Sequence, residues 1–198
     1  MRGCMRGLVA MLAFTSSAAA LEPAPLVMLP VGTKLHQDDG GKAVVWTITE
    51  SKPGAYAAER DDGISFASIG GLATPPLIYN GRHGLERQRI TRGDPLAIYP
   101  LAVGRSVRFS VSGETPSKGW RWQIDHACVV TGTDRTTVRA GSFETYVVRC
   151  ERVPAGMTTD QTITRYYAPS IGATVLTIVE EHRNNTKWRT ELVMPPGN

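Results

Sequence analysis

The residue types that could do chemistry are few in this chain and are scattered along it. The four histidines share no spacing typical of a metal site; they are His36, His83, His126 and His182. The 198 residues contain no Gly-x-Ser-x-Gly elbow, no His-Glu-x-x-His motif and no glycine-rich phosphate-binding loop. The sequence therefore predicts no catalytic residues, no metal site and no cofactor.

Asp125 and His126 form the most suggestive pair, because they are adjacent and close to Cys128. Neighbouring residues on a strand point to opposite faces of the sheet, so these two cannot act on one substrate atom. His126 shares the face of Cys128, and we expect it to be a hydrogen-bonded polar residue at the margin of the sheet.

Paired carboxylates are the remaining catalytic candidate, because glycoside hydrolysis needs only two of them across a cleft. Glu180 and Glu181 are adjacent on an expected strand and so diverge, while Asp62 and Asp160 are expected in turns. A carbohydrate-active hydrolase is kept as the third alternative for the function.

Cys128 and Cys150 give the clearest structural signal. They stand near the outer ends of two β-prone runs that are separated by a glycine-containing turn at residues 138–141. Pairing 128 with 150 centres the hairpin near residue 139, within that turn. The sequence therefore predicts a cross-strand disulfide, which stabilises by roughly 3 kcal/mol and persists only in an oxidising compartment.

The first twenty residues have the pattern of a signal peptide. Arg2 and Arg6 precede an apolar run at 8–14 and a small-residue stretch that ends at Ala20. We expect cleavage near Ala20 and a periplasmic or secreted bacterial protein. No later apolar run approaches the ~20 residues that a membrane-spanning helix requires, so the mature chain is predicted to have no transmembrane segment.

The charge of the chain is unremarkable. Its formal net charge is +4, which becomes about +2 without the two arginines of the signal peptide, and its basic residues are scattered. A nucleic-acid partner is therefore not expected.

The elements that must position these residues are short β-strands. Alternating apolar and polar runs are separated by turn chemistry, including Asp-Asp-Gly at 38–40 and 61–63, and no helical periodicity extends beyond one turn. Residues 70–100 carry the weakest signal, with short strands expected near 77–79 and 85–91. The predicted fold is all-β: an antiparallel, strongly curved sheet, open barrel or sandwich of about ten short strands. Its parts are a Pro-rich lead (21–30), one β-domain (31–194) and a tail (195–198).

Three segments together resemble a known family: 99–104 before a strand, the turn at 138–146, and 166–172 before the closing hairpin. Over residues 30–194 they are similar to the TapB-like family of exported bacterial β-rich proteins, which is related to a larger domain family of unknown function. Arg139 stands where that family commonly has proline, and Tyr166 where it often has tryptophan. The resemblance implies an envelope β-protein similar to lipoprotein-carrier folds, and no catalytic residues.

Four aromatic residues are candidates for contact with a ligand or partner: Trp120, Trp122, Tyr166 and Tyr167. The alternative for each is a place in the sheet core. The predicted function is a non-enzymatic envelope module that binds or assembles a protein partner. The first alternative is a carrier of a lipid or other hydrophobic ligand in a concave β-cavity.

Overall fold

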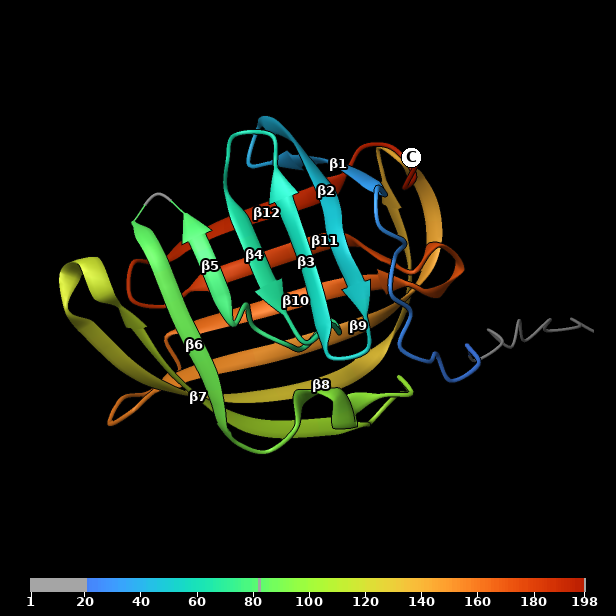
Figure 1. Ribbon diagram of the computed structural model, residues 1–198. Helices are drawn as coiled ribbons and strands as arrows, with labels where there is room; N and C mark the ends of the chain where they lie inside the picture. The colour runs from blue at the N-terminus through green and yellow to red at the C-terminus, as the bar shows by residue number, and fades with distance from the viewer. Residues whose placement is uncertain (1–20, 82, 198) are drawn as a thin grey trace, which may run out of the picture.

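The computed structural model describes residues 21–81 and 83–197, so the predicted signal peptide lies outside the described residues. Twelve antiparallel strands form one closed barrel in which each strand pairs with its neighbours in the chain (Figure 1). The strands are β1 (Lys34–Asp39), β2 (Lys42–Lys52), β3 (Ala55–Arg60), β4 (Ser65–Ser68), β5 (Ile78–Gly81), β6 (Gly84–Arg92), β7 (Ser106–Thr115), β8 (Trp120–Val138), β9 (Gly141–Pro154), β10 (Gln161–Ala168), β11 (Ala173–Glu181) and β12 (Thr186–Leu192). Short 3₁₀ helices are η1 (Pro95–Ile98), η2 (Pro116–Lys118) and η3 (Pro169–Ile171).

The antiparallel all-β class is confirmed, while the open form and the count of about ten strands are corrected. Closure depends on β1 pairing with β12, where Gln37 lies opposite Leu192. Such a pairing joins residues from the two ends of the chain, and periodicity within a strand carries no information about it. The short strands expected near 77–79 and 85–91 are present as β5 and β6.

Both expected Asp-Asp-Gly hairpins are present. In the first, the turn itself is Gly40-Gly41, with φ of 63° and 93°, between Asp39 and Lys42. Positive φ at both central residues suits the right-handed twist of the strands, and glycine adopts it without strain. The second connects β3 to β4 through Gly63, with φ of 84°.

The longest hairpin, β8–β9, is joined as the sequence predicts. Cys128 lies directly opposite Cys150, and the two form a disulfide. At the tip, Val138 pairs with Gly141. Arg139 in this turn contacts Asp38 and also donates to Glu191 at 2.9 Å, so it ties the hairpin to the β1–β12 seam.

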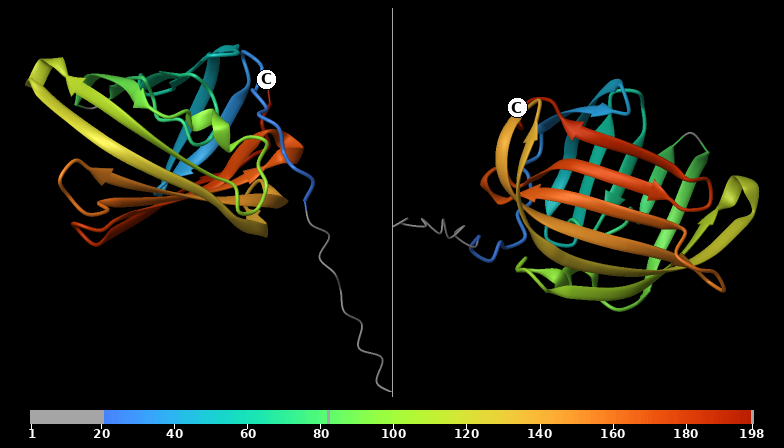
Figure 2. Two further views of the ribbon diagram at one scale, coloured as in Figure 1. Left: turned by 90° about the horizontal axis from the view of Figure 1, so that it is seen from below. Right: turned by 180° about the vertical axis from the view of Figure 1, so that it is seen from behind.

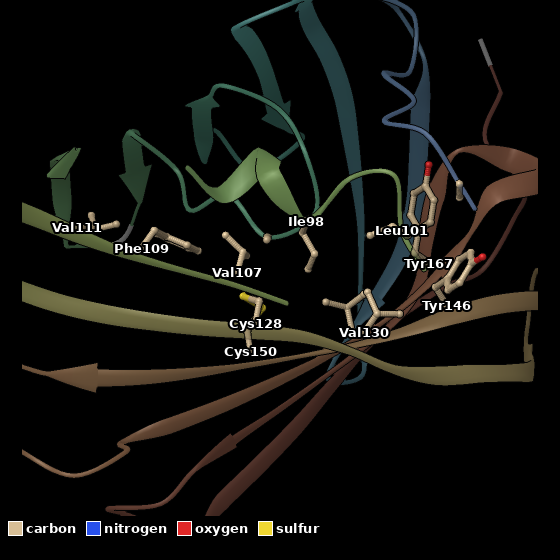
Figure 3. Packing of buried hydrophobic residues seen from close by; sticks show 13 residues of the cluster. Ile98, Leu101, Val107, Phe109, Val111, Cys128, Val130, Tyr146, Cys150 and Tyr167 are labelled. Atoms are coloured by element: carbon tan, nitrogen blue, oxygen red, sulfur yellow. A yellow bond between two sulfur atoms is a disulfide. The ribbon is translucent and has the colours of Figure 1, made fainter. Parts of the chain in front are cut away.

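The barrel is flattened, so that β2–β6 form one wall and β7–β12 form the other (Figure 1). The two walls converge toward the end that carries the N-terminal segment and spread apart toward the opposite end (Figure 2). The main apolar cluster includes Ile98, Leu101, Phe109, Val130 and Tyr146, together with both cysteines (Figure 3). This packing fixes the long strands of the second wall.

The lead at residues 21–30 packs against the barrel. Ala24 and Leu101 exchange backbone hydrogen bonds of 3.0 and 2.7 Å, and the Tyr146 hydroxyl lies 2.9 and 2.8 Å from the carbonyl oxygens of Leu21 and Glu22. Within residues 21–81 and 83–197, no helix has the length and apolar character needed to cross a membrane.

Candidate ligand-binding site

Two adjoining cavities lie between the walls of the barrel. One has a volume of about 550 Å³ and is lined by several charged side chains; we call it the polar cavity. The other has a volume of about 440 Å³ and is lined mainly by apolar and aromatic side chains; we call it the aromatic cavity. Pro76 and Arg165 line both, so the two cavities meet at Arg165.

The aromatic cavity is lined by residues of β1–β4 and β10–β12, by the N-terminal segment and by the stretch that follows β4. Trp46 and Phe66 pack edge to face with ring centroids 5.3 Å apart, and Tyr56 lies 6.3 Å from Phe66. Burial raises the pKa of Tyr56 to about 12, as expected for a phenol in an apolar environment. Arg165 is the one ionisable cation among the residues that line this cavity.

Arg165 reaches the cavities because of its position on β10. Side chains alternate along a strand, so Ile163, Arg165 and Tyr167 face the same side. No hydrogen bond or ion pair joins Arg165 to any other described residue. Burial lowers the pKa of Arg165 to about 10, so the guanidinium still carries its charge at neutral pH.

Two tyrosines complete the surroundings of Arg165. The Tyr99 hydroxyl accepts a hydrogen bond of 2.9 Å from the Leu72 amide. Burial raises the pKa of Tyr99 to about 12, and the nearby Arg165 opposes that rise. Tyr167, only 4% exposed, has a buried hydroxyl that no described group hydrogen-bonds. Buried hydroxyls usually have a hydrogen-bond partner, so the unpaired Tyr167 hydroxyl is an exception.

The polar cavity contains His126, whose ring stacks on Phe109 with centroids 4.7 Å apart. Burial lowers the pKa of His126 to about 4; Arg152 and Arg165 act in the same direction, and Asp125 opposes them. The ring is therefore neutral at pH 7. Its expected place on the cysteine face is correct, but the expected margin of the sheet is wrong, because His126 lies within β8 directly opposite the buried Phe109 of β7 and shares its face.

The aromatic candidates from the sequence are divided between different places. Trp120 and Trp122 line the polar cavity, and Tyr167 lines the aromatic cavity. Tyr166 lines neither, because it is next to Tyr167 on β10 and so takes the opposite direction, where it packs in a second apolar cluster. Arg165 was missed by the sequence analysis. The pattern that could have identified it is strand alternation, which places Arg165 on the same face of the strand as Ile163 and Tyr167.

A second interior arginine has a different environment. Arg60 is 8% exposed; its guanidinium donates two hydrogen bonds to Asp62, of 2.7 and 2.9 Å, and one to Asp39, of 3.2 Å. Its guanidinium carbon lies 5.5 Å from the centroid of the Trp46 ring. We call these residues the Arg60 cluster. Asp62 also accepts from Lys42 at 2.7 Å, and these bonds hold the pKa of Asp62 far below its usual range.

Two of the carboxylates considered for hydrolysis are thus engaged elsewhere. Asp62 binds Arg60 and Lys42, and Glu180 binds Lys187 at 2.8 Å. In the part of the chain that the structure describes, no three His, Cys, Asp or Glu residues are grouped so as to hold a metal ion.

The fold of the chain resembles that of two bacterial β-proteins of known structure. The hypothetical lipoprotein YmcC from Escherichia coli superposes with a TM-score of 0.58 at 9% identity, covering 86% of this chain and 87% of that one. A protein of Bacteroides fragilis with a YmcC-like fold, described as a putative exported protein, gives a TM-score of 0.50 at 13% identity, with 88% of this chain and 100% of that one covered. At these identities the likeness concerns the fold alone. No family model matches the chain, and no curated protein matches its sequence.

Proposed function

We propose that this protein is a non-enzymatic binding protein of the bacterial envelope that holds a hydrophobic small molecule inside its barrel. The aromatic cavity is the observation that carries the proposal. Its volume of about 440 Å³ falls within the roughly 300–1,000 Å³ typical of ligand pockets, and aromatic and aliphatic side chains dominate its lining. Of the functions considered from the sequence, the carrier of a hydrophobic ligand fits this geometry best.

The proposed location follows from the chemistry of the chain. A disulfide such as Cys128–Cys150 indicates an oxidising compartment, and the E. coli and B. fragilis neighbours are described as a lipoprotein and an exported protein. A periplasmic or secreted protein, released by cleavage near Ala20, is consistent with both. Membership of the TapB-like family stays a prediction.

A second candidate is the binding of a protein partner at the rim of the polar cavity. Trp120 and Met157 line this cavity and are 58% and 54% exposed. Exposed apolar residues of this kind are frequent at protein interfaces, and here they border the interior of the barrel. A partner bound at this rim would be well placed to deliver or receive a ligand.

The proposal is tested by titrating the purified protein with the neutral fluorescent probe N-phenyl-1-naphthylamine. We expect saturable binding of one equivalent. Ala58, which is 2% exposed and lines the aromatic cavity, provides the blocking variant Ala58→Phe, for which we expect at least tenfold weaker binding. The matched control is Ala57→Phe, on the opposite face of β3, with unchanged binding.

Two results would contradict the proposal. One is the absence of saturable probe binding to the unmodified protein. The other is unchanged affinity in Ala58→Phe when circular dichroism shows that this variant is folded.

A further inference from the structure

We propose that the ligand is an acidic amphiphile, whose single carboxylate or phosphate headgroup binds Arg165 while its apolar chain fills the aromatic cavity. This inference rests on the proposed function and adds the chemical class of the ligand. It also assigns Arg165, Tyr99 and Tyr167 as the headgroup site.

The first argument is the missing counter-charge of Arg165. Interior arginines are normally paired, because removing a cation from water costs several kcal/mol unless an anion or hydrogen bonds compensate. Arg60 follows this rule with Asp62 and Asp39. Arg165 has no ion pair or hydrogen bond within residues 21–81 and 83–197, although it lines both cavities. An anion in the cavities would supply the missing partner.

The second argument is the set of hydrogen-bond donors near Arg165. A guanidinium offers a planar pair of N–H groups that matches a carboxylate or a phosphate. Tyr167 lines the same cavity and its buried hydroxyl has no hydrogen-bond partner among the described residues. Tyr99 uses its oxygen as an acceptor, so its O–H remains available to donate. Burial raises the pKa of both phenols, which keeps them protonated donors at neutral pH.

The third argument is the charge of the adjoining polar cavity. Its lining includes the guanidinium groups of Arg152, Arg165 and Arg183 but only two carboxylates, Glu86 and Asp160. The lowered pKa of His126, to which Arg152 and Arg165 contribute, is consistent with a positive potential in this space. An anion at Arg165 is therefore also favoured by the charges of the polar cavity.

The position of Arg165 also sets the orientation of the ligand. Because Arg165 lies where the two cavities meet, a headgroup bound there leaves the chain next to Trp46, Tyr56 and Phe66. A ligand without a charged headgroup would displace water from Arg165 and would supply no anion to replace it. The site should therefore discriminate strongly against ligands that lack the charge.

The test compares three ligands of equal chain length: hexadecanoate, hexadecyl phosphate and hexadecanol. Each displaces the bound N-phenyl-1-naphthylamine, which has no charge, from the unmodified protein. We expect at least one of the two acids to bind ten times more tightly than the alcohol or better. The ratio between the two acids then tells whether the headgroup site prefers a carboxylate or a phosphate.

Three variants assign the effect to its residues. Arg165→Met should remove the advantage of the acids while leaving the affinity for hexadecanol within about twofold. Arg149→Met makes the same change of charge at a half-exposed arginine that pairs with Glu151, and should keep the advantage. Tyr167→Phe removes a hydroxyl that has no described partner, so it should fold normally and weaken only the acids, by about three- to tenfold.

The results separate this inference from the proposed function. Equal binding of acids and alcohol by the unmodified protein, or an acid advantage that survives in folded Arg165→Met, overturns the headgroup site but leaves hydrophobic binding intact. Binding of none of the ligands and no probe overturns both. Arg165→Gln replaces Arg165→Met if the methionine variant does not fold. In that case the inference is overturned if the acids keep their full advantage over hexadecanol in Tyr167→Phe and lose less than twofold of it in Arg165→Gln.

Discussion

Arg60 and Arg165 are both arginines that face the interior of one barrel, yet their surroundings differ in almost every respect. Arg60 has two carboxylates and the face of Trp46 around it. Arg165 has two phenols and two cavities around it. The first arrangement is complete without a ligand, and the second lacks an anion. The difference separates a structural cation from one that is available for binding.

The cause of the difference lies in where each arginine stands on its strand. Arg60 ends β3, close to Asp39 at the end of β1 and to Asp62 in the turn after β3, so carboxylates at the strand ends reach its guanidinium. Arg165 is in the middle of β10, directly between Val148 on β9 and Thr177 on β11. Carboxylates are favoured in turns and are disfavoured in the middle of an interior strand face, so a mid-strand arginine finds none.

The disulfide joins β8 to β9 in the wall that carries Arg165, and its removal gives the largest expected effect. Replacing both Cys128 and Cys150 by alanine should lower the free energy of unfolding by roughly 3 kcal/mol, because the bridge restricts the unfolded chain over a separation of 22 residues. Urea denaturation monitored by tryptophan fluorescence measures it. Reductant should destabilise the natural protein and leave the double variant unaffected; a midpoint insensitive to reductant in the natural protein would contradict the prediction.

Neutralising each arginine in turn tests the comparison itself. Arg60→Met should lower the free energy of unfolding by about 1–2 kcal/mol, because it leaves Asp39 and Asp62 without their shared partner and removes the contact with Trp46. Arg165→Met should cause no loss in the absence of ligand, since it removes an interior, partly exposed charge that has no counter-ion among the described residues. The two urea midpoints provide the measurement. Equal destabilisation by both substitutions would show that Arg165 is also structural.

The smallest expected effect uses His126 as a reporter of the charge on Arg165. Its pKa, about 4, is lowered first by burial and then by Arg152 and Arg165, so Arg165→Met should raise it, while Arg60→Met should leave it unchanged. NMR titration of the histidine ring signals measures this. Because folding lowers the pKa, the neutral ring contributes stability that is complete above about pH 6.5 and declines as the pH falls toward 4. Arg165→Met should make that decline in stability shallower. An unchanged pKa of His126 in this variant would show that the charge of Arg165 does not act on the His126 ring.

Much of the architecture follows from local patterns in the sequence. The Cys128–Cys150 pairing was predictable because both residues share the apolar parity of a hairpin whose midpoint falls in a turn. The two Asp-Asp-Gly hairpins were predictable because glycine tolerates the positive φ that such turns require. The candidate site was harder to predict from the sequence. Trp120, Trp122 and Tyr167 were named from aromatic character alone, and so was Tyr166, which lines neither cavity.

The sequence by itself determined the strands, their turns and the disulfide, because each depends on residues near one another in the chain or on one hairpin. Tertiary structure alone decided that β1 meets β12, that two cavities remain between the walls, and that Arg165 reaches both without a carboxylate beside it. The physical reason is that a strand's alternation specifies which side chains point inward. What they meet there is set by the opposite wall, whose residues are distant in the sequence.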